Sequence, residues 1–289
     1  FHPDDKGRLM AYWVDTQDVL AVPYDTPIPG YRNDTINTLR LWKSVATDEF
    51  NLGEFNAGSY PESVAAKNAA EHITMVLYPN DASENGKELR LRQQYLLACA
   101  SLKDVLREWI RLHGNDFSQF AEKNCFQLND THPAISVAEL MRLLMDEHDL
   151  EWDQAWAITS ATMAYTNHTI MAEALERWPE DLIKNQLPRI HMILEELNRR
   201  LCEKLWDRYP GEWDRIAKMA ILAYGMVHMA NLCISQSFSV NGVSQLHGSI
   251  IKNDTFSEYG QMEPRKFTYV TNGVTHRRWL MACNPRLTA

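Results

Sequence analysis

One apolar stripe constrains the fold of this chain more than any other feature of its sequence. Apolar residues recur there at alternating spacings of four and three: Leu91, Tyr95, Ala98, Leu102, Val105, Trp109 and Leu112. This spacing places all of these side chains on one face of an α-helix. Gly114-Asn115 follows the last of them, and glycine commonly lies just past a helix end. We therefore expect a long helix that buries one face in a core.

Shorter segments alternate between helix-like and strand-like patterns. We expect helices over residues 62–77, 151–163, 187–205 and 216–232, and a further helix after Pro133. We expect strands over 37–42, 125–130 and 266–270, a loop over the proline-rich residues 24–34, and a polar interruption over 164–169. Helices that alternate with short apolar strands predict a helix-rich α/β fold whose parallel sheet is covered by helices on both faces.

Composition excludes several classes of function. The formal net charge is −9 and the pI is about 5.6, which suits neither a nucleic acid nor an anionic membrane as partner. The longest apolar run is interrupted by Gly225 and His228 and is too short to span a bilayer, and no apolar signal-peptide segment follows the first residues. The five cysteines form no C-x-x-C pair. We therefore expect reduced thiols in a cytoplasmic protein.

The histidines and glycines lack the spacings of common metal and phosphate sites. None of the ten histidines forms H-x-x-x-H or H-x-H, and none of the glycines forms G-x-G. We expect no metal ion on this basis, and no nucleotide loop of the usual glycine-rich kind.

Polar residues that follow short apolar strands are the best candidates for chemistry. Residues 129–132 and 166–169 read Asn-Asp-Thr-His and Thr-Asn-His-Thr. Ligands of parallel sheets bind beyond the carboxyl ends of strands, and such side chains both donate and accept the hydrogen bonds that sugar hydroxyls need. A structural interpretation also stands: Asp130 or Thr131 would cap a helix, and His168 would be a hydrogen-bonded core histidine. Residues 80–86 form a polar loop, either a plain connector or a mobile gate. Arg277-Arg278 is expected to be a surface pair.

Read together, the motifs resemble one enzyme family. In chain order they are YDTPIPGYRND, NTLRLW, VLYPND, GKELRLRQQY, QLNDTHP, AYTNHT, EALERWP, SVNGVSQLH and TNGVTHRRWL. This series resembles the α-glucan (glycogen, starch or maltodextrin) phosphorylases across the whole chain.

The resemblance implies a glycosyltransferase-B architecture of two doubly wound domains. Residues 1–289 would form the later part of the N-terminal, glucan-binding domain, and the C-terminal domain with the pyridoxal 5'-phosphate lysine would lie outside this segment. The implied reaction transfers a glucosyl unit from an α-1,4-glucan to phosphate, and the implied parent enzyme is a homodimer. The isolated segment would be inactive. A non-catalytic glucan-binding module remains the alternative.

The resemblance also assigns roles to particular residues. His168 would touch the transferred glucose and take part in catalysis. Asp130 and His132 would contact the acceptor side of the glucan, and Asp81 would lie on a gate loop that moves when phosphate enters. Ala82 stands where many members of the family have an asparagine that contacts glucose, so that contact is not expected here.

Overall fold

A four-stranded parallel sheet lies at the centre of the fold. The structure is a computed structural model that describes residues 1–3, 7 and 9–289. The strands are β5 (Phe126–Asn129), β6 (Met163–Thr166), β10 (Ser239–Gly242) and β11 (Phe267–Tyr269), in the spatial order β11-β10-β6-β5. Leu128, Tyr165 and Val240 lie side by side across three strands and are buried. The expected α/β fold with a parallel sheet is confirmed, and the carboxyl ends of its strands share one edge.

The long helix is α4 (Glu84–His113), as the apolar stripe predicts. The Ser83 hydroxyl caps its start by accepting a hydrogen bond from the Gly86 N–H. Gly114 ends it with a positive φ of 60°, a conformation that glycine adopts readily. Leu91, Ala98, Leu102 and Trp109 are buried, and Leu112, in the last turn, is exposed.

Helices connect the strands of the parallel sheet. Between β5 and β6 lie α6 (Ser136–Arg142), its π-helical continuation η1 (Leu143–Glu147) and α7 (Trp152–Thr162). Between β6 and β10 lie η2 (Ala172–Ala174), α8 (Glu180–Gln186), α9 (Pro188–Arg208), α10 (Trp213–Met219) and α11 (Met229–Gln236). Between β10 and β11 lie α12 (Gln245–Ile250), η3 (Ile251–Thr255) and α13 (Ser257–Met262), and α5 (Phe120–Lys123) precedes β5. A second, antiparallel sheet contains β7 (Arg177–Pro179), β8 (Leu222–Ala223) and β9 (Met226–His228).

Every residue of α6 is buried, including a charged pair. The Arg142 guanidinium donates to both carboxylate oxygens of Glu139, at 2.8 and 2.9 Å, and Glu139 is fully buried. The Tyr95 hydroxyl of α4 donates to the same carboxylate at 3.0 Å. The pair is therefore satisfied by hydrogen bonds inside the core and joins α4 to α6.

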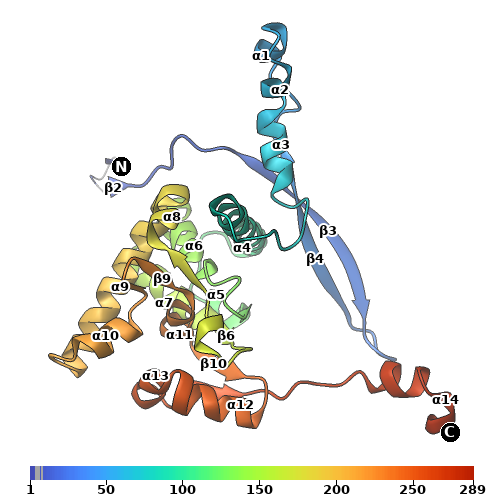
Figure 1. The fold of residues 1–289 in the computed structure, drawn as a ribbon, viewed down its shortest axis with the longest axis vertical. Coiled ribbons are helices and arrows are strands. Elements are labelled where there is room, and N and C mark those ends of the chain that lie inside the picture. The colour runs from blue at the N-terminus through green and yellow to red at the C-terminus, as the bar shows by residue number, and fades with distance from the viewer. Residues whose placement is uncertain (4–6, 8) are drawn as a thin grey trace.

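Two parts of the chain extend away from this body (Figure 1). One is the hairpin of β3 (Val19–Pro29) and β4 (Ile36–Ala46), followed by the short helices α1 (Leu52–Asn56), α2 (Tyr60–Ser63) and α3 (Ala65–His72). The other is the C-terminal segment with η4 (Arg277–Ala282) and α14 (Pro285–Thr288). Arg277 and Arg278 are exposed, as expected, and the Arg277 guanidinium lies 4.1 Å from the ring centroid of Tyr31 at the hairpin tip. The paired strands β1 (His2–Pro3) and β2 (Leu9–Met10) lie near the N-terminus.

Several expectations about local structure are wrong, including the loop over 80–86, whose last three residues belong to α4. Residues 24–29 form half of β3 instead of a loop. Pro23, Pro27 and Pro29 occupy alternate positions of a two-stranded ladder, where every second N–H points away from the partner strand and is not needed. Residues 216–232 are not one helix, because the chain turns back at Tyr224 and Gly225, both with positive φ. Residues 62–77 are also interrupted, since α2 ends at Ser63 and α3 at His72.

Residues 164–166 belong to strand β6, so the expected polar interruption begins only at Asn167. Among the described helices, none combines the length and the hydropathy needed to cross a bilayer.

Candidate functional site

Hydrogen bonds join the carboxyl ends of β5, β6 and β10. The Thr166 hydroxyl donates to Asn241 Oδ1 at 2.8 Å, and Gln127 Nε2 donates to the Thr166 hydroxyl at 2.8 Å. Backbone bonds continue the parallel ladder one residue further, from the Asp130 N–H to the Thr166 carbonyl and from the Asn167 N–H to the Asn241 carbonyl. Two polar segments far apart in the sequence, 129–132 and 166–169, therefore meet at this edge.

His168 projects from this edge as an exposed side chain. Its Nε2 lies 2.6 Å from Asn129 Oδ1. Because an amide oxygen only accepts hydrogen bonds, Nε2 carries the proton and donates it. The interpretation of His168 as a core histidine is therefore wrong. The ring is held by the end of β5 and faces solvent, where it can reach a ligand.

Asp130 adopts a left-handed backbone conformation, with φ of 64°. Its Oδ1 accepts the N–H of Thr131 at 2.6 Å, a local turn contact. Neither residue caps α6, which begins at Ser136 after Ile135 and has no side-chain cap, so the capping interpretation is wrong. His132 is exposed and lies edge-on to Tyr78, with 6.5 Å between ring centroids.

Arg90 links the exposed Asp81 to the core. Its guanidinium lies 2.6 Å from Asp81 Oδ2 and 2.7 Å from Glu176 Oε2. Burial raises the pKa of Glu176 above its usual value, while the positive charge of Arg90 opposes that rise, as does His132 to a lesser degree. Asp81 is thus linked to Glu176 through Arg90, and His132 acts on the same carboxylate electrostatically. Among the described residues, no hydrogen bond or ion pair joins Asp81 to His168.

Two buried residues support the segment that carries His168. One is Asn167, which belongs to the candidate segment 166–169, and the other is His247, which was not predicted from the sequence. Asn167 is fully buried, its Nδ2 donates to the Tyr165 hydroxyl at 3.0 Å, and its Oδ1 accepts the Thr169 N–H at 3.1 Å. His247 Nδ1 accepts the Val243 N–H, so Nε2 carries the proton and donates to Asn167 Oδ1 at 3.1 Å. The same strand-end rule applies to β10, in the motif SVNGVSQLH, and would have selected His247.

The strand-end edge offers amide, hydroxyl, imidazole and carboxylate groups, a set that suits sugar hydroxyls. Residues 129–132, 166–169 and 241–247 contain no lysine. These positions therefore cannot supply the amine that binds pyridoxal phosphate as a Schiff base, and a lysine that holds this cofactor must lie outside them.

Comparisons with known proteins identify the family of this chain. The family model of the carbohydrate phosphorylases matches residues 1–289. The chain is similar to the muscle form of glycogen phosphorylase of Ovis aries, with 48% identity over 287 residues that cover 96% of this chain and 34% of that protein.

Two further relatives give the same result. The muscle form of Homo sapiens is 47% identical over 290 residues, covering 96% of this chain and 34% of that protein. The brain form of Mus musculus is 47% identical over 285 residues, covering 95% and 34%. The chain thus spans about a third of the length of these relatives. Matched by the family model along its whole length, this chain belongs to the carbohydrate phosphorylase family.

Proposed function

We propose that this chain supplies the sugar-facing part of an α-1,4-glucan phosphorylase. The enzyme would transfer a glucosyl unit from the end of glycogen, starch or maltodextrin to phosphate and release glucose 1-phosphate. The observation that carries the proposal is the exposed His168, oriented by Asn129 at the shared carboxyl edge of β5 and β6. The relatives named glycogen phosphorylase support the choice of reaction.

Within this proposal each polar residue has a distinct role. His168 contacts the transferred glucose and is the catalytic residue of this segment, since contacts that strengthen as charge develops on the sugar accelerate the reaction. Asp130 and His132 contact the acceptor side of the glucan. Asp81 lies on the gate loop, and its ion pair with Arg90 holds that loop until phosphate enters.

The rest of the proposed enzyme completes the site. Pyridoxal 5'-phosphate would be held by a lysine outside the strand ends, and its phosphate would supply acid–base chemistry when bound. In this proposal residues 1–289 form the later part of the N-terminal domain, and the enzyme is a cytoplasmic homodimer that contacts neither nucleic acid nor membrane. The five cysteines are all free, which suits a reducing compartment.

Steady-state phosphorolysis in the full-length enzyme tests the role of His168. We expect His168→Ala to lower kcat by roughly 100-fold, because a contact made mainly in the transition state is lost. His72→Ala, which removes an exposed histidine on α3, is the matched control and should leave kcat unchanged. An unchanged kcat with a raised KM in His168→Ala would contradict the catalytic role.

The alternative function, a glucan-binding module without catalysis, is favoured for the isolated chain by the absence of lysine from its strand-end segments. Calorimetric titration of the 289-residue chain with maltoheptaose should then detect binding that His168→Ala weakens, without release of glucose 1-phosphate. Phosphate-dependent release by this chain alone would show that it carries a complete site.

A further inference from the structure

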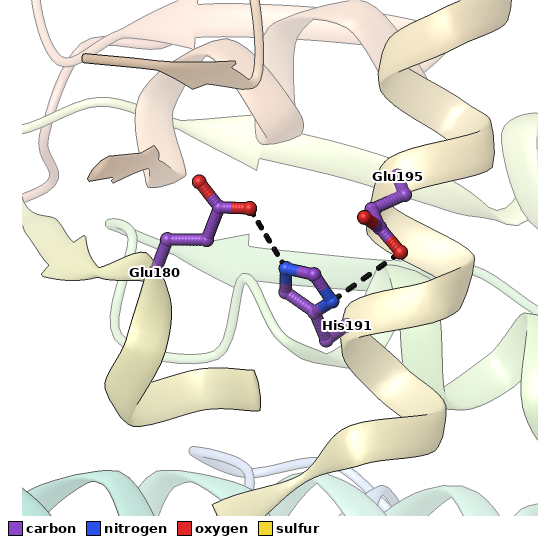
Figure 2. A group of neighbouring side chains, drawn as sticks. All are labelled: Glu180, His191 and Glu195. Atoms are coloured by element: carbon purple, nitrogen blue, oxygen red, sulfur yellow. Dashed lines mark hydrogen bonds and ion pairs between the residues drawn. The ribbon is translucent and has the colours of Figure 1, made fainter. Parts of the chain in front are cut away.

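A buried histidine lies between two carboxylates on the α8–α9 helix pair (Figure 2). His191, in the first turns of α9, is only 2% exposed. Its Nε2 lies 2.9 Å from Glu180 Oε1, at the start of α8, and its Nδ1 lies 3.4 Å from Glu195 Oε2, one turn further along α9. Only Leu187 separates the two helices, so the three side chains are held on a short, rigid unit.

When the imidazole of His191 is neutral, one of its two nitrogens cannot donate a hydrogen bond to the carboxylate beside it. A neutral histidine carries one N–H, so it donates to one carboxylate and presents a lone pair to the other. Neither Glu180 nor Glu195 forms an ion pair with a lysine or arginine in the described part of the chain. Glu196 and Glu203, on the same helix, are by contrast paired with arginines. The two carboxylates around His191 therefore lack a strong cation.

We propose that Glu180, His191 and Glu195 bind a divalent transition-metal ion such as Zn²⁺. One imidazole nitrogen with carboxylate oxygens is a ligand set that zinc accepts. One ligand atom from each residue can be chosen so that all lie within 4.8 Å of one another. Ligand atoms around tetrahedral zinc lie about 3.3 Å apart, so the distances between these three ligand atoms need to shorten by roughly 1.5 Å at most.

Glu195 makes this closure feasible. Its side chain is 56% exposed and, among the described residues, forms an ion pair with His191 alone, so it can turn toward the ion without breaking another such pair. The exposed side also leaves a position for water, as in zinc sites with three protein ligands. Sequence spacing did not predict this site, because it contains one histidine and a carboxylate from a neighbouring helix.

Calorimetric titration of the chelator-treated, metal-free chain with ZnCl₂ tests the proposal. We expect saturable binding of one ion, with affinity lowered at least about tenfold by Glu180→Gln and by Glu195→Gln. Both substitutions are at partly exposed positions, and circular dichroism would verify that the variants fold. Glu196→Gln, which changes a neighbouring carboxylate bound to arginines, is the matched control and should retain the affinity of the unaltered chain.

Two further readouts do not depend on enzymatic activity. Bound Co²⁺ should give a visible absorption spectrum that Glu195→Gln diminishes, since direct ligation alters the electronic transitions of the ion. Zn²⁺ should raise the Tm of the unaltered chain more than that of Glu195→Gln, because an ion that binds only the folded state stabilises it. Lack of saturable binding, or equal affinity in both glutamine variants and the unaltered chain, would overturn the proposal.

Discussion

Shortening the Asn167 side chain should destabilise the fold because hydrogen bonds at the candidate site are lost, and not because apolar packing is lost. Asn167→Ala removes hydrogen bonds to the Tyr165 hydroxyl, the Thr169 N–H and His247 Nε2. Each such bond contributes about 0.5–1.5 kcal/mol net, and a buried partner left unsatisfied costs more. Tyr165 is fully buried and His247 nearly so. We therefore expect the free energy of unfolding to fall by about 3 kcal/mol.

Urea unfolding followed by circular dichroism measures this difference. The matched control is Asn253→Ala, at an exposed position in η3 where the side chain donates only to the Ser249 hydroxyl among the described residues. That substitution should change the free energy of unfolding by less than about 0.5 kcal/mol. A loss below about 1 kcal/mol for Asn167→Ala would refute the reasoning, since it would mean that water or neighbouring groups replace all three bonds.

Two other predictions follow from charged pairs on α6 and α9. Glu139→Leu should lower the free energy of unfolding by about 3–5 kcal/mol in the same urea assay, because it leaves the buried Arg142 guanidinium without its bidentate partner. Adding Arg142→Leu should recover part of that loss. A double variant whose loss equals the sum of the two single losses would contradict the pairing. Hydrogen bonds from Arg199 and then Arg200 lower the pKa of Glu196 to about 2. A lowered folded-state pKa gives stability that is present above the unfolded value of 4.5 and is lost as pH falls toward 2. Carboxyl NMR titration should therefore find Glu196 ionised well below pH 4.5, and Arg199→Gln should raise the midpoint of that titration. A titration midpoint near 4.5 for Glu196 in the unaltered chain would exclude the pairing in solution.

Helix α4 was predictable because its apolar stripe runs along its whole length and has clear end signals. Strand β6 was not, because its short buried segment Met163–Thr166 follows α7 without a break and shows no polar alternation. The β8–β9 hairpin was not predictable from the sequence for a related reason. Its turn at Tyr224-Gly225 interrupts a methionine- and alanine-rich stretch that has the composition of a helix.

The candidate site was predictable to the extent that it follows apolar strands in the sequence. Residues 129–132 and 166–169 were both selected for their polar side chains, although a strand was expected only before the first segment, and the structure brings the two segments to one edge. The supporting groups Arg90, Glu176 and His247 were not selected, since their importance depends on contacts between residues far apart in the chain. Such pairings require the register of the parallel sheet, which local patterns do not reveal.

The order of strands in the parallel sheet also bears on how the site forms during synthesis. Strands β5, β6, β10 and β11 are added to the sheet in the order in which a ribosome makes them. The contact between His168 and Asn129 spans 39 residues, whereas that between Asn167 and His247 spans 80. Because domains fold from the N-terminal side as the chain emerges, the exposed histidine can be positioned first. Its buried support is completed only when α12 has been made.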